Sequence, residues 1–325
     1  MKRRDLLQTI FWGLSIPSSL LSAVYCAELP DEIAVADKLF KKSKFAEARE
    51  IYKKFRNLSA TKNQADNWKY CTLQIVRCSR RLCDLSLAVE EYFQYCRIDS
   101  AASLETIPII WSTSSSLIQG TKPNSQSSLN LLRQITSSNY NPAAELLAAS
   151  VLAAEREPSL RNTGLHHLQK LANPHDSESN NTEKNSNPQP EQTEPIKILA
   201  NNVMLLAGVL LWKERIPILR NEKELTSLRR HLERIPEPLR AGAFFWYGKA
   251  TAQLGLLDEA VIEIMKIPIQ YPEDTVLVLD ALEEAAKILD KLNRKNQAEQ
   301  LRNEKKELLN EIAKPEKIWF ASFYF

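Results

Sequence analysis

Glycine is scarce in this sequence: there are seven glycines in 325 residues, against a usual share of about 7%. β-Turns depend on glycine for positive φ angles, so the scarcity argues against a fold rich in hairpins of strands. Leu, Ala, Glu, Lys and Arg are abundant instead, and these residues favour helices. With 44% hydrophobic and 26% charged side chains, the chain has globular proportions and enough apolar residues for a buried core.

An excess of charge of one sign is also missing. The 43 basic and 40 acidic residues give a formal net charge of +3 and are interspersed along the chain. Binding to nucleic acid needs a concentrated basic surface, so the sequence gives no reason to expect a nucleic-acid partner.

Catalytic signatures are absent as well. The sequence contains no G-x-x-x-x-G-K-[ST], G-x-G-x-x-G or G-x-S-x-G motif, so phosphate loops and nucleophile elbows have no candidate. Of four histidines, His166 and His167 are adjacent and would point about 100° apart on a helix, which excludes an i, i+4 metal pair. His175 lies in a polar stretch, and His231 lies in a charged one that we expect to face solvent. We predict no catalytic, cofactor-binding or metal-binding residues, and hence no enzyme.

Five cysteines are present, and Cys71, Cys78, Cys83 and Cys96 lie within one stretch of helical periodicity. No C-x-x-C motif or histidine at metal-ligand spacing accompanies them. One interpretation is that they are small buried hydrophobic residues on packed helices. The alternative, in an oxidising compartment, is a disulfide, for example between Cys83 and Cys96.

Residues 1–27 have the organisation of a signal peptide, with the basic "MKRR", an apolar stretch and small residues near Cys26. We therefore expect export to the periplasm or cell envelope. The alternative is an uncleaved membrane anchor, because the apolar run approaches the roughly 20 residues that span a bilayer. "RRDLLQ" also partly resembles the twin-arginine export signal, through Arg3, Arg4, Leu6 and Leu7.

The rest of the chain shows helical periodicity in two parts, residues 28–172 and 196–314, and no strand alternation of useful length. Between them, residues 173–195 contain no large apolar side chain, so we expect a disordered linker or loop. The stretch is either a boundary between two helical parts or a long insertion within one continuous solenoid. The predicted fold is all-α, an α-solenoid of antiparallel helical hairpins.

Two segments resemble the tetratricopeptide repeat, a helical hairpin of about 34 residues. In "YGKATAQLGLLDEAVIEIMKIPIQYP", small residues, a turn glycine, apolar residues and a terminating proline fall at the repeat positions: Gly248, Gly255, Ala260, Ile264 and Pro272. The N-terminal hairpin matches through Ala36, Leu39, Phe45, Ala48, Tyr52 and Phe55. A weaker third copy contains Ala286 and Ala298.

The resemblance implies a non-enzymatic scaffold that holds peptides or protein partners in a concave groove, without a cofactor. Alternatives are a membrane-anchored assembly factor and a helical accessory subunit of an envelope enzyme. In the tail, residues 315–325, Trp319, Ala321, Phe323 and Phe325 recur with the period of two that is typical of a strand, and the tail resembles the terminal signal of outer-membrane barrel proteins. It either docks on the last helices or contacts a partner's sheet edge or a membrane, as the N-terminal apolar segment also could.

Overall fold

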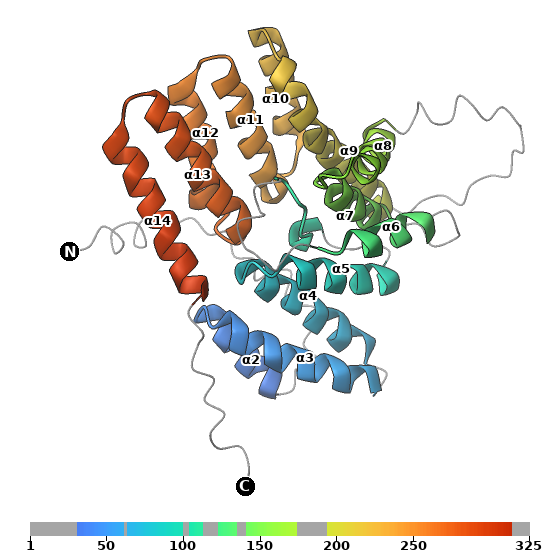
Figure 1. The fold of residues 1–325 in the computed structure, drawn as a ribbon. Helices are drawn as coiled ribbons and strands as arrows, with labels where there is room; N and C mark the ends of the chain where they lie inside the picture. Colours follow the sequence, from blue (N-terminus) through green and yellow to red (C-terminus); the bar gives the residue numbers. More distant parts are fainter. Residues whose placement is uncertain are drawn as a thin grey trace, which may run out of the picture.

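The computed structural model describes residues 31–61, 64–99, 104–112, 123–134, 141–173 and 194–313. Within these residues every regular element is helical, which confirms the predicted all-α fold (Figure 1). The expected signal peptide, the aromatic tail and residues 174–193 of the expected linker lie outside the described residues.

The α-helices are, in chain order, α2 (Asp31–Lys41), α3 (Phe45–Thr61), α4 (Ala65–Arg81), α5 (Leu85–Ile98), α6 (Ser125–Gln134), α7 (Pro142–Ala153), α8 (Pro158–Ala172), α9 (Glu194–Arg215), α10 (Glu222–Arg234), α11 (Ala241–Gln253), α12 (Leu257–Gln270), α13 (Thr275–Lys291) and α14 (Lys295–Ala313). Short 3₁₀ helices are η2 (Leu104–Thr106), η5 (Ile216–Ile218) and η6 (Glu237–Leu239). The start of α9 at Glu194 means that the last two residues of the expected linker are helical.

Most helices that follow one another in the chain pack against one another, as in a solenoid. Figure 1 shows α2 to α5 at the base of the molecule, α6 to α9 at the right, and α10 to α14 continuing across to the left. The curve is tight enough for α13 to contact α4. The solenoid therefore curves back on itself, so that helices α4 and α13 are in contact.

Four of the hairpins share one turn. Ser43, Cys83, Gly255 and Asn293 have φ angles of 61°, 57°, 83° and 59°, and each follows the first helix of a pair. The residue after each one donates its N–H to the carbonyl five positions earlier, as in Lys44 to Leu39 at 3.0 Å and Asp84 to Ser79 at 2.8 Å. This is the Schellman type of helix end, and it joins α2–α3, α4–α5, α11–α12 and α13–α14.

Small residues recur in the same frame. Five positions after each of these turn residues stands a fully buried alanine, and the four are Ala48, Ala88, Ala260 and Ala298. Seven positions before the turn residues stand Ala36, Val76, Gly248 and Ala286. A Cβ atom at Gly248 would lie 2.4 Å from Ile264 Cγ1, so the two helices of that hairpin approach too closely for a larger side chain.

The repeat residues named from the sequence lie in these hairpins. Ala36 and Tyr52 are fully buried, with the partly buried Leu39, Phe45 and Phe55 packed on the same cluster. Ile264 is buried, and Pro272 follows the end of α12. The α4–α5 hairpin was not predicted to be a repeat copy, because Val76 stands at the small position and Cys83 at the turn.

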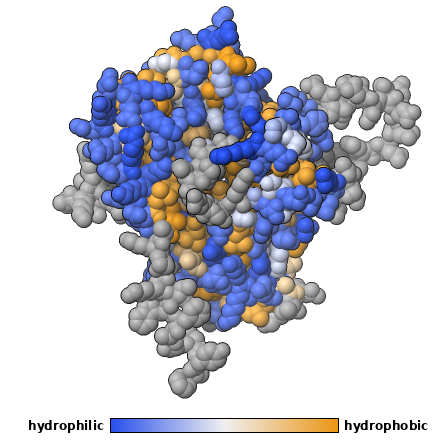
Figure 2. All heavy atoms as spheres, in the orientation of Figure 1, coloured by the Kyte–Doolittle hydropathy of each residue, from blue (hydrophilic) through white to orange (hydrophobic). Residues whose placement is uncertain are grey.

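One cluster of buried residues extends from Val76 to Ile288 and includes helices on both sides of residues 174–193. α8 and α9, which flank that stretch, contact each other directly. On the face shown in Figure 2, hydrophilic residues cover most of the surface, with patches of hydrophobic residues between them. Among the described residues, no helix combines the length and apolar character that crossing a membrane requires.

Candidate functional site

An extended segment, residues 107–112, lies inside the solenoid. It follows η2 and crosses the middle of the molecule (Figure 1). Pro108 disfavours helical geometry at Ile107, and β-branched Ile109 and Ile110 favour extended backbone. Ile107, Ile109, Ile110 and Trp111 are between 5% and 8% exposed. Residues 107–112 are therefore a part of the core, although they form neither helix nor strand.

Helices from across the chain hold this segment by polar contacts. Ile110 donates its N–H to Ser150 Oγ of α7 at 3.3 Å, and Trp246 Nε1 of α11 donates to the Trp111 carbonyl at 3.1 Å. The Ser112 side chain hydrogen-bonds to Asp280 of α13. Each of these helix side chains binds a backbone group or a hydroxyl group of the segment, which is how proteins hold an extended peptide.

The Trp111 ring lies directly on the backbone of α11. A Cβ atom at Gly242 would come within 2.1 Å of the indole, so only glycine at this position leaves room for it. Gly242 is thus the floor of an indole pocket, with Trp246 one turn further along the same helix. The aromatic run from Phe244 to Tyr247 on the same helix is buried.

Residues 108–112 line one side of a small, mostly apolar cavity, and the polar side chains of Arg80, Asp274 and Asp280 contribute to its other walls. Arg80 of α4 pairs with Asp274 at 3.2 Å, and the two side chains are 11% and 13% exposed. Burial raises the pKa of Asp280 to about 6, and the hydrogen bond with Ser112 opposes this shift. A carboxylate held in this environment favours a hydroxyl group or a cation beside it.

The same region closes the solenoid. Besides its ion pair with Asp274, Arg80 donates to the Glu105 carbonyl at 3.2 Å. The next residue, Arg81, donates to the Pro272 carbonyl at 2.6 Å. The contacts with Asp274 and Pro272 join the α4–α5 hairpin to the start of α13.

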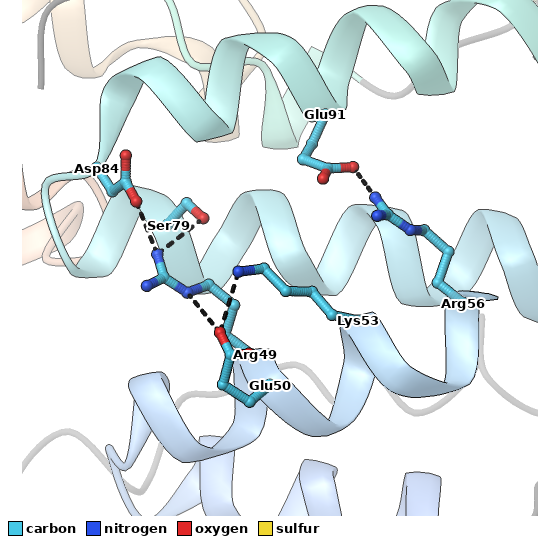
Figure 3. A network of polar contacts seen from close by, with 7 residues as sticks. All are labelled: Arg49, Glu50, Lys53, Arg56, Ser79, Asp84 and Glu91. Atoms are coloured by element: carbon cyan, nitrogen blue, oxygen red, sulfur yellow. Dashed lines mark hydrogen bonds and ion pairs between the residues drawn. The ribbon is translucent and has the colours of Figure 1, made fainter. Parts of the chain in front are cut away.

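A second polar network fixes the first hairpin on the second (Figure 3). Arg49 of α3 reaches Asp84, the N-cap of α5, at 2.9 Å, and Arg56 of α3 pairs with Glu91 of α5. The two arginines are seven residues apart, and so are the two acidic residues, so the ion pairs lie along matching helix faces. Lys53 binds Glu50 within α3 at 3.0 Å. The network orients the hairpins and presents no reactive group.

The histidines were predicted to be non-catalytic, and two of them make defined contacts. His167 Nδ1 of α8 lies 2.6 Å from Glu145 Oε1 of α7, and Glu145 is completely buried. His231 was expected in solvent, yet its Nε2 lies 2.8 Å from the Leu205 carbonyl and burial lowers its pKa. Across the described ranges, no group of three or more His, Cys, Asp or Glu side chains is placed to hold a metal ion.

The cysteines within the described residues, Cys71, Cys78, Cys83 and Cys96, are all buried and unbonded to one another. The alternative of a Cys83–Cys96 disulfide is therefore wrong for this structure. Burial raises the pKa of Cys71, Cys78 and Cys83 to about 12, which keeps these thiols protonated and unreactive at neutral pH.

Comparisons of this chain with protein-family models, with curated proteins and with solved structures found no match.

Proposed function

We propose that this protein is a non-enzymatic, tetratricopeptide-like scaffold. It binds a protein partner by holding an extended peptide of that partner inside the solenoid. The observation that carries the proposal is the seating of residues 107–112. Their backbone and hydroxyl groups are bound by side chains of three helices, and their indole fits a pocket with a glycine floor.

The architecture supports this proposal in physical terms. Stacked helical hairpins create a continuous inner surface that an isolated hairpin lacks. Contacts to backbone groups supply affinity for any extended peptide, and shaped pockets add preference for particular side chains. Ser150, Trp246 and Asp280 provide the first kind of contact or bind a hydroxyl group, while Gly242 provides the second.

We place this activity in the periplasm or cell envelope, on the basis of the export signal expected in residues 1–27. The partner in this proposal is a protein. The N-terminal apolar segment and the aromatic tail are proposed as additional points of membrane or partner contact.

The test is site-specific photo-crosslinking of the chain in its native host. A crosslinking amino acid replaces Val276, which lines the cavity, and in a matched control it replaces Ile262, which is 62% exposed on α12. We expect a defined protein to be captured from position 276 and not from position 262. The same capture from a chain lacking residues 316–325 separates the groove from the aromatic tail. If no position yields a protein, the scaffold proposal is wrong.

A further inference from the structure

We infer that residues 107–112 occupy the groove as an internal placeholder, and that a partner replaces them with an extended apolar segment in which an aromatic residue is followed by serine or threonine. This inference rests on the proposed function and specifies the chemistry of its partner.

The partner's chemistry follows from three consecutive positions. At the first, Ser150 Oγ accepts a backbone N–H, as it does from Ile110. At the second, the pocket over Gly242 takes a flat ring, and Trp246 donates to the carbonyl of the same residue. At the third, Asp280 binds a hydroxyl group, as it does with Ser112. Neighbouring apolar side chains of the occupant cover the remaining inner surface, as Ile107 and Ile109 do.

The way in which the segment is held permits replacement. Within the described residues it joins no β-ladder, and its hydrogen bonds with Ser150 and Trp246 are made by side chains of the helices. The surrounding helices satisfy their own backbone hydrogen bonds internally, so removal of the segment leaves them paired. What removal exposes is apolar surface, which an incoming segment of similar chemistry covers again.

Competition from the placeholder sets the expected binding behaviour. A tethered segment acts at an effective concentration on the order of millimolar. A partner's apparent affinity equals its intrinsic affinity multiplied by the fraction of chains whose groove is open. Weakening the placeholder without changing the groove must therefore increase the affinity for a peptide added in solution.

The test uses a fluorescent peptide with the sequence of residues 104–112, titrated against the full chain and its variants. Trp111→Ala empties the indole pocket and leaves its walls unchanged. We expect this variant to bind the peptide at least about tenfold more tightly than the wild-type chain. The double variant Trp111→Ala with Gly242→Ala is the matched control. Its added Cβ atom occupies the ring position, so the peptide should lose this gain.

The inference is overturned if the folded Trp111→Ala chain shows no saturable binding of the peptide. It is also overturned if the double variant, Trp111→Ala with Gly242→Ala, binds the peptide as tightly as Trp111→Ala does. Native-state hydrogen exchange of the wild-type chain provides a second test that needs no variant. The amides of residues 110–112 should open more readily than those of α11. Exchange only through global unfolding would show that the segment is a permanent part of the core. If crosslinking from position 276 captures a protein but one of these two tests is negative, the scaffold proposal stands and the placeholder inference is wrong.

Discussion

Asp280 is a buried carboxylate at the most polar point of the groove, only 6% exposed. Ser112 and Asp274 adjoin it, and Lys249 of α11 and Lys305 of α14 act on it electrostatically. Its pKa is raised by burial from 3.8 to about 6, so the folded chain binds this proton more tightly than the unfolded chain. The contribution of Asp280 to stability is therefore largest at low pH and is lost as the pH rises from about 4 through about 6.

We expect Asp280→Asn to be more stable than the wild type at pH 8, by about 1–3 kcal/mol, because it removes a buried charge. The difference should shrink as the pH falls from about 6 to about 4, because Asp280 of the folded chain takes up its proton in this range. Urea unfolding of both chains at several pH values measures this. Glu259→Gln, at an exposed position of α12, is the control. A difference that stays constant with pH would contradict the assignment.

The left-handed turn residues give a second prediction at this scale. Ser43 is exposed with φ of 61°, and Gly255 has φ of 83° with nothing within 4 Å of an added Cβ atom. Ser43→Gly should stabilise the chain and Gly255→Ala should destabilise it, each by about 1 kcal/mol, since non-glycine residues are strained in this region. Thermal unfolding of both variants tests this. Shifts of the same sign would show that the turns are not equivalent.

Among the elements, α3 is linked to α5 and its N-cap by two ion pairs of unequal burial. Glu91 is 9% exposed and its partner Arg56 is 19% exposed, so loss of Arg56 leaves a carboxylate with little access to water. A double-mutant cycle on Arg56→Met and Glu91→Gln should give a coupling energy of about 1–3 kcal/mol. The exposed pair Arg294–Asp258, at 49% and 55%, should give less than about 1 kcal/mol. Equal values would contradict the importance of burial.

Helix positions were predictable at this scale wherever the periodicity was strong. Asn141 followed by Pro142 is a pattern typical of a helix start, and the Asn141 side chain accepts from Ala143 N–H at 3.0 Å at the start of α7. The α4–α5 hairpin escaped the repeat pattern because Cys83 holds a conformation for which glycine or asparagine is the usual signal. Its alanine, Ala88, stands in the frame but is uninformative without the turn residue.

For the whole molecule, closure depends on contacts between hairpins distant in the sequence. Asp274 both caps α13, accepting from Leu277 N–H at 3.3 Å, and pairs with Arg80 of α4. Asp274→Asn keeps a good capping residue and removes the charge. We expect this variant to lose hydrogen-exchange protection in α4 and α13 together, because the contact between them is weakened.

Asp274→Ala is the matched variant, since it removes the cap as well as the charge. It should show additional loss of protection in the first turn of α13. If Asp274→Asn exchanges as the wild type does, the Arg80–Asp274 pair does not hold the solenoid closed.

The amino-acid sequence determined the local features of this protein. Helical periodicity, scarce glycine and capping residues act within a few positions of the chain, so they specify helices and several of the turns without knowledge of distant contacts. The tertiary structure alone decided that residues 107–112 fill the interior. That outcome depends on Ser150, Gly242, Trp246 and Asp280, which are brought to one place only when the solenoid curves back on itself. No local pattern in "ETIPIIWS" encodes those partners, because the side chains that bind Ile110 and Trp111 lie 40 and 135 residues away in the chain.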